Sequence, residues 1–129
     1  MISWFEKHNK VSWVITIIGA VLIFYMSTLS FKLGVGGSGL GIESILYHIC
    51  AFFLFSLFLQ ISLLKGKKNW FVLIAGIFIA IAYGVSDEFH QLFVLGRNCS
   101  VLDIGWDSIG IIFSAIIYAI FLEFKKQKL

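Results

Sequence analysis

Long apolar runs, separated by short polar stretches, dominate the chain. Four runs approach the length of about 20 residues that a helix needs to cross the hydrocarbon core of a bilayer. They cover residues 11–31, 44–64, 70–89 and 104–124. Apolar residues lie on all sides of each run, which would leave a soluble protein almost no wetted surface. The pattern predicts an all-α fold in which a single domain, residues 1–129, forms an integral membrane four-helix bundle.

The composition supports a membrane protein. Of the 129 residues, 60% are hydrophobic and 13% are charged, whereas roughly a quarter of the residues are charged in soluble domains.

The first run is too long for the hydrophobic region of a signal peptide, so we expect a retained helix. The glycine-rich residues 34–41 should form an outer loop. Cys50 lies within the second run and Cys99 in a polar stretch, so the cysteines indicate no disulfide framework.

The basic residues predict how the helices cross the membrane. Eight lysines precede the first run, join the second to the third, or follow the fourth, while Lys32 and Arg97 alone fall in the other two connections. Because basic connections stay on the cytoplasmic side, we expect both termini to be cytoplasmic. The net charge of +3 then matches anionic lipid headgroups and gives no indication of nucleic acid. We therefore expect a multi-pass cell-membrane protein with membrane lipids as partners.

The acidic residues gather at the opposite, outward ends of the runs. Five of the seven are found there: Glu43, Asp87, Glu88, Asp103 and Asp107. Charges near a helix end are cheaply solvated by water and headgroups. We expect Glu43, Glu88 and Lys32 to be solvated in this way.

Small and polar residues share one face of each predicted helix. Such faces allow close packing in membranes, so we expect them to point into the bundle. They comprise Thr16, Gly19, Ala20, Ile23, Ser27 and Ser30; Ser44, Tyr47, His48 and Ala51; Gly76, Ala80, Tyr83, Gly84, Asp87, His90 and Gln91; and Asp103, Asp107, Gly110 and Ser114. On these faces Asp87, Asp107 and His48 lie about one turn inside their helices. An unpaired charge there would cost several kcal/mol, so these three residues need a partner or a wet cavity.

Three stretches resemble the VanZ-like family of small membrane proteins, which is named for an accessory protein of glycopeptide resistance. They are IFYMSTLSF, ESILYHICAFFLFSLFL and DEFHQLFVLGRNCSVLDIGWDSIG. The family motif is matched at Asp87, Glu88, Gln91, Phe93, Gly96, Arg97, Asp103 and Gly110, with His48 matching a histidine of the second helix. Leu95 replaces the usual proline, and Asp107 replaces the usual asparagine. The resemblance implies a role in the cell envelope, linked to teicoplanin resistance.

Three hypotheses follow for the outward polar residues. In the first, they bind an anionic envelope lipid or a lipid-linked precursor, because the guanidinium of Arg97 offers a planar fork of donors to phosphate or carboxylate. The binding residues would be Arg97, Gln91, Asp87, Glu88, Asp103 and His48, with Ser100 completing the hydrogen bonds. The many acids favour a divalent cation that bridges them to the ligand.

In the second hypothesis, the protein is an intramembrane hydrolase or transferase. The pairs Asp87 with His90, and Asp103 with Asp107, are spaced to place two metal ligands on one helical face. His48, Asp87 and Asp107 are then the candidate catalytic residues. No recognised metal motif accompanies them.

In the third hypothesis, the polar residues form a structural network without a ligand. Arg97 would pair with Asp87 or Asp103, and His48 would bond to a group of the third helix. Removing one partner of such a buried pair typically costs about 3 to 5 kcal/mol.

Overall fold

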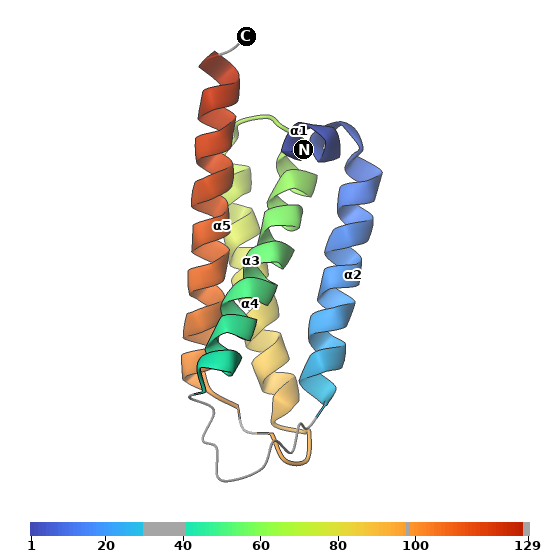
Figure 1. Ribbon diagram of the computed structural model, residues 1–129, viewed down its shortest axis with the longest axis vertical. Coiled ribbons are helices and arrows are strands. Elements are labelled where there is room, and N and C mark those ends of the chain that lie inside the picture. Colours follow the sequence, from blue (N-terminus) through green and yellow to red (C-terminus); the bar gives the residue numbers. More distant parts are fainter. Residues whose placement is uncertain (30–40, 98, 128–129) are drawn as a thin grey trace.

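The protein is a bundle of helices in a computed structural model that describes residues 1–29, 41–97 and 99–127. The helices are α1 (Ile2–Lys7), α2 (Asn9–Thr28), α3 (Ile42–Leu64), α4 (Trp70–Gln91) and α5 (Val101–Gln127). Figure 1 shows α2 to α5 side by side, with α1 at the end of the bundle where α5 finishes. Within those ranges there is no strand. Ser30, Lys32, most of the glycine-rich stretch and Lys128 lie outside the described residues.

The four long helices are apolar on the outside of the bundle. Each is long and apolar enough to cross a membrane. Phe71, Phe78 and Phe124 are 81%, 67% and 63% exposed, whereas several serines and a glutamine are fully buried. An apolar surface around a partly polar interior suits hydrocarbon better than water. The prediction of an all-α membrane bundle is confirmed.

The helix ends differ from the ends of the apolar runs. α5 begins at Val101 rather than at residue 104, and α4 continues to Gln91 rather than ending at residue 89. The reason is that hydropathy marks where the chain meets a polar environment, whereas a helix continues as long as its backbone hydrogen bonds do. At the start of α5, the N–H groups of Asp103 and Ile104 donate to the carbonyl of Ser100.

Helix α3 is the central helix and packs against α2, α4 and α5. Its closest neighbour is α5 at Gly110, where an added Cβ would lie 2.3 Å from the carbonyl oxygen of Ile49. Only glycine allows the two backbones to approach this closely. The contact fixes the register of α3 against α5, which carry His48 and the aspartates of the predicted site.

Most of the predicted inward residues are buried, but α3 is an exception. Ser44, Tyr47 and Ala51 are only half-buried. The buried residues of α3 are instead His48, Phe52, Phe55, Ser56, Leu59, Gln60, Ile61, Ser62 and Leu64. Because α3 contacts all four other helices, it has no single inward arc, and large side chains fill the space opposite small residues.

Candidate functional site

Six polar residues from three helices form one buried group, which we call the acidic cluster. They are His48 of α3, Asp87, Glu88 and Gln91 of α4, and Asp103 and Asp107 of α5. Each residue is 8% exposed or less. The helices bring them together because α3 and α5 begin, and α4 ends, at the same end of the bundle (Figure 1). We call this the acidic end.

The imidazole of His48 lies between two carboxylates of α5. His48 Nδ1 is 2.9 Å from Asp107 Oδ1, within hydrogen-bonding distance. Its other nitrogen, Nε2, is 3.8 Å from Asp103 Oδ2. The two aspartates are one helical turn apart, so they reach opposite edges of the same ring. The expectation that His48 bonds to the third membrane helix, α4, is therefore wrong: its partner is on α5.

Glu88 is buried, not solvated as the sequence suggested. The side-chain amide of Gln91 donates to its Oε1 at 3.0 Å, and the backbone N–H of Ser100 donates to its Oε2 at 2.9 Å. The chain that follows α4 folds back over the end of that helix, and this return covers Glu88. Glu43, by contrast, is exposed as expected.

Two carboxylate oxygens of the acidic cluster have no hydrogen-bond partner among the described residues. They are Asp87 Oδ1 and Asp107 Oδ2. Asp87 is held through its other oxygen, which accepts from the Gln91 amide at 3.2 Å. Buried polar atoms are almost always hydrogen-bonded, so unpartnered oxygens call for an explanation such as a bound ion.

Arg97 forms no ion pair with the cluster. Its side chain is half-buried, and among the described residues no carboxylate lies within 4.0 Å of it. Its Nε is buried without a hydrogen-bond partner. The guanidinium lies instead within electrostatic range of the Tyr47 hydroxyl. The expected pairing of Arg97 with Asp87 or Asp103 is therefore not formed.

His90 points to α2 rather than into the cluster. Its ring stacks on Phe24, with the ring centroids 4.3 Å apart. Among the described residues, the set whose potential metal-ligand atoms all lie within 4.8 Å of one another consists of His48, Glu88 and Asp107. This set shares only Asp107 with the predicted metal ligands Asp87, His90, Asp103 and Asp107.

An apolar groove of about 300 Å³ runs between α2 and α3. Its lining includes Leu22, Met26, Ala51 and Phe55, with Tyr47 contributing a hydroxyl. Tyr47 lies within electrostatic range of Asp87, Asp107 and Arg97. The groove therefore begins beside the acidic cluster and continues along the membrane-spanning helices. Cys50 and Cys99 are both free and exposed.

The opposite end of the bundle holds another buried carboxylate, which was not predicted from the sequence. Glu6 of α1 is 6% exposed and accepts a hydrogen bond from the Tyr118 hydroxyl at 2.9 Å. Lys125 donates to its other carboxylate oxygen, and the N–H of Gly66 donates to the Tyr118 oxygen at 3.3 Å. We call Glu6, Tyr118 and Lys125 the Glu6 cluster. The available signal was that Glu6 is one of only two acids among the many lysines of this end.

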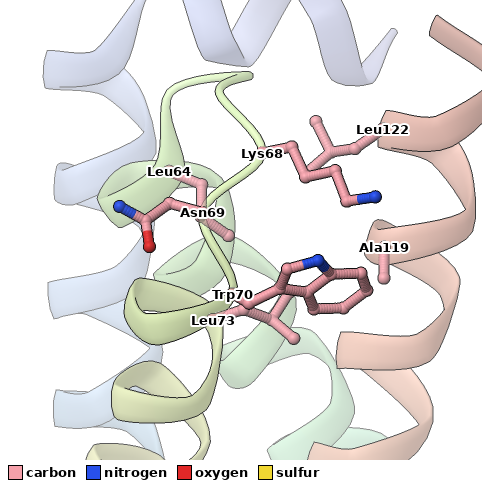
Figure 2. A pocket seen from close by; sticks show the side chains of 7 residues that line it. All are labelled: Leu64, Lys68, Asn69, Trp70, Leu73, Ala119 and Leu122. Carbon is pink, nitrogen blue, oxygen red and sulfur yellow. The ribbon is translucent and has the colours of Figure 1, made fainter. Parts of the chain in front are cut away.

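A small cavity lies near the Glu6 cluster, between the start of α4 and α5. Figure 2 shows Trp70 and Lys68 at this cavity, across from Ala119 and Leu122 of α5. Lys68 pairs with Glu123, and its ammonium lies 4.7 Å from the centroid of the Trp70 ring. The cavity has a volume of about 10 Å³, which holds at most one water molecule. It is too small for a ligand.

Comparison with known proteins identifies the family and nothing closer. No curated protein and no solved structure matches the chain. The VanZ/LLP1 family model matches residues 4–122, which include both clusters except for Lys125 near the end of α5. The match therefore spans α2, α3 and α4 and most of α5. This membrane helical bundle belongs to the VanZ/LLP1 family.

Proposed function

We propose that the protein is a multi-pass cell-membrane protein that binds the anionic headgroup of an envelope lipid or a lipid-linked precursor. The binding site is at the acidic end, which faces outward. The VanZ resemblance extends the proposal to a role in glycopeptide resistance of the teicoplanin type. Retention or delivery of such a lipid is a binding function that requires no chemical step.

The main support for this proposal is that Arg97 forms no ion pair within the described chain. A half-buried guanidinium with no carboxylate within 4.0 Å in the described chain is available to an external anion. Its buried and unpartnered Nε supports the same conclusion, because a buried donor normally has an acceptor. Arginine binds phosphate and carboxylate through two parallel N–H donors.

The groove between α2 and α3 favours a lipid over a soluble anion. It is lined almost entirely by apolar side chains and begins beside Tyr47, which Arg97 also approaches. A headgroup at Arg97 could therefore extend its acyl or prenyl chain into the groove without leaving the bilayer. An apolar chain gains free energy with each methylene that leaves water, so such a lipid would stay bound through purification.

Native mass spectrometry from mild detergent tests the proposal. Wild-type protein should retain a lipid that carries phosphate or carboxylate, and Arg97→Ala should lose it. Arg97→Lys should lose most of it, because an ammonium cannot form the paired N–H contacts. The matched control is Lys67→Ala, which removes an exposed cation from the opposite end of the bundle. Equal lipid retention in all four proteins would overturn the proposal.

The outward orientation has its own test, which uses the exposed Cys99 in the connection between α4 and α5. In intact cells, a membrane-impermeant maleimide should label a Cys50→Ser protein at Cys99. The double variant Cys50→Ser, Cys99→Ser is the control and should stay unlabelled. Labelling that requires cell lysis would place the acidic end in the cytoplasm.

Acid–base chemistry on the bound lipid is the second candidate function, and the His48–Asp107 pair favours it. A carboxylate at 2.9 Å orients the imidazole and stabilises its protonated form, as required of a general base. In liposomes that contain a lipid-linked diphosphate, wild-type protein would then release a cleaved product, whereas His48→Gln would retain the intact lipid. Intact lipid with both proteins leaves binding alone as the function.

A further inference from the structure

We propose that the acidic cluster binds one divalent transition-metal cation, such as Zn²⁺ or Mn²⁺, through His48, Glu88 and Asp107. The proposal does not depend on a lipid ligand. It rests on the charge balance of the cluster, on the spacing of these three residues, and on an unpartnered oxygen of Asp107.

The charge balance of the acidic cluster favours a cation. Four acidic residues, Asp87, Glu88, Asp103 and Asp107, are each at most 8% exposed. Among the described residues, the imidazole of His48 is the only basic group within 4.0 Å of any of them. Buried carboxylates that stay ionised require paired positive charge or metal coordination. One divalent cation would supply more positive charge than any side chain in contact with the cluster.

The spacing of the three residues fits ligands of one ion. His48 Nδ1 and Asp107 Oδ1 are 2.9 Å apart, and Glu88 completes a set in which all ligand atoms lie within 4.8 Å of one another. Two ligands that each lie about 2.1 Å from an ion are about 3.0 to 3.4 Å apart, depending on the coordination geometry. The His48–Asp107 pair already has this spacing, and the more distant atoms of the set would have to move closer around the ion to complete the site.

Two of the three ligands, Asp107 and Glu88, are already held in position and still have a free lone pair, whereas Nδ1 of His48 would exchange its hydrogen bond to Asp107 for the ion. Asp107 Oδ2 is buried without a partner, and Asp107 is 2% exposed. Glu88 accepts one hydrogen bond at each oxygen, which leaves further lone pairs because a carboxylate has about four acceptor sites. These hydrogen bonds orient the Glu88 carboxylate as outer-shell contacts do in metal sites.

Asp103 takes the outer-shell position behind His48. When Nδ1 binds the ion, Nε2 carries the proton and faces Asp103 Oδ2 at 3.8 Å. Such a carboxylate orients a ligating imidazole and makes it more basic. The mixed set of one nitrogen and two oxygens suits Zn²⁺ or Mn²⁺, whereas Ca²⁺ takes six to eight oxygen ligands.

Metal titration of the purified, tag-free, chelator-treated protein tests the inference. With Mn²⁺ followed by electron paramagnetic resonance, and Zn²⁺ by elemental analysis, wild-type protein should bind one ion per chain. Asp103→Asn, which alters an outer-shell contact, should weaken binding by about tenfold, and Glu88→Gln and Asp107→Asn, which each remove a ligand, should weaken it more. Glu43→Gln, which alters an exposed acid at the same end, should bind like wild type. No saturable binding, or the same affinity in every variant, would overturn the site.

A measurement on wild-type protein covers the case in which a variant does not fold. X-ray absorption at the zinc edge should show one imidazole and oxygen ligands, and the spectrum should not change in His90→Gln. Sulfur ligands would assign the zinc to Cys50 or Cys99, and a shell without imidazole would exclude His48. Either result would overturn the proposal.

The experiments can reject the metal site without rejecting the lipid site, and the lipid site without rejecting the metal site. Arg97→Ala should lose the lipid but keep the affinity for Mn²⁺, because Arg97 is not one of the three ligands. Metal binding with no retained lipid would reject the proposed function alone. Retained lipid in a protein that binds no metal would reject the metal site alone.

Discussion

The two ends of the bundle each bury carboxylates, but they do so in different ways. At the Glu6 cluster, one carboxylate receives a tyrosine hydroxyl and a lysine, one at each oxygen. At the acidic cluster, four carboxyl groups surround one imidazole, and two of their oxygens have no partner in the described chain. The first end is a completed network. The second has more negative charge than its own residues compensate, which is typical of a site that binds something else.

The Glu6 cluster also connects distant parts of the chain. Glu6 belongs to α1, its partners Tyr118 and Lys125 belong to α5, and Gly66 follows α3. Gly66 has a positive φ of 75°, and an added Cβ would lie 2.7 Å from Lys125 Nζ. Glycine is therefore needed both for the turn and for the close approach. The Glu6 cluster holds α1 and the turn after α3 against α5, which is a structural role.

Lys125→Ala should have the largest effect on stability. The variant leaves the Glu6 carboxylate, 3% exposed, without its cation, and removing one partner of a buried ion pair costs on the order of 3 kcal/mol. Because the Lys125 side chain is itself 35% exposed, we expect the lower part of the known range. A thermal or chemical melt in detergent measures the loss. Lys67→Ala is the control, and equal stability of the two variants would mean that the Glu6 network does not stabilise the bundle.

The same substitution at each end should have opposite effects. Glu6→Gln keeps one acceptor oxygen but loses the charge and one of the two hydrogen bonds, so it should destabilise the protein by about 1.5 to 3 kcal/mol. Glu88→Gln also loses one of two hydrogen bonds, but this loss is offset because it removes one uncompensated charge. In metal-free protein it should therefore leave the stability unchanged or raise it by up to about 1 kcal/mol.

Melts of the two glutamine variants, with and without Zn²⁺, measure this difference. Zinc should stabilise wild-type protein and Glu6→Gln, but not Glu88→Gln, because a bound ion stabilises only a protein that retains the site. If Glu88→Gln destabilises metal-free protein as much as Glu6→Gln does, the acidic cluster is a structural network like the other end.

The sequence predicted the membrane helices well because their signal is local. Apolar runs, the spacing of small residues and the absence of proline each act within one helix. The close contact of α5 with α3 at Gly110 could be predicted in this way, since Gly110 lies on the predicted inward face of α5. The central position of α3 could not, because it depends on how the other helices pack around α3.

The contacts of individual polar residues were harder to predict, because they depend on how the connection between α4 and α5 folds back over the end of α4. On a helical wheel Glu88 points away from Asp87, yet the backbone of Ser100 covers it. For Arg97 the sequence left open a bound anion or a pairing with Asp87 or Asp103. Glu6 was not predicted to be buried, since a six-residue helix carries too little periodicity to indicate a buried face.

Arg97→Ala should have the smallest effect on stability and a large effect on binding. Because Arg97 forms no ion pair within the described chain, we expect its removal to change stability by no more than about 0.5 kcal/mol, as for a surface substitution. Lys125→Ala removes a cation from the other end and should cost several times more. The two melts, recorded in delipidated protein, therefore compare a cation that completes a network with one that is available to a ligand.

Added lipid then separates the two roles of these cations. An anionic phospholipid should raise the melting temperature of wild-type protein and of Lys125→Ala, but not that of Arg97→Ala, because a ligand stabilises the folded state in proportion to its affinity. A neutral phospholipid with the same chains controls for filling of the apolar groove alone. If delipidated Arg97→Ala melts as early as Lys125→Ala, Arg97 belongs to a structural network. If it melts like wild type and also loses the response to anionic lipid, the difference between the two ends is one of function.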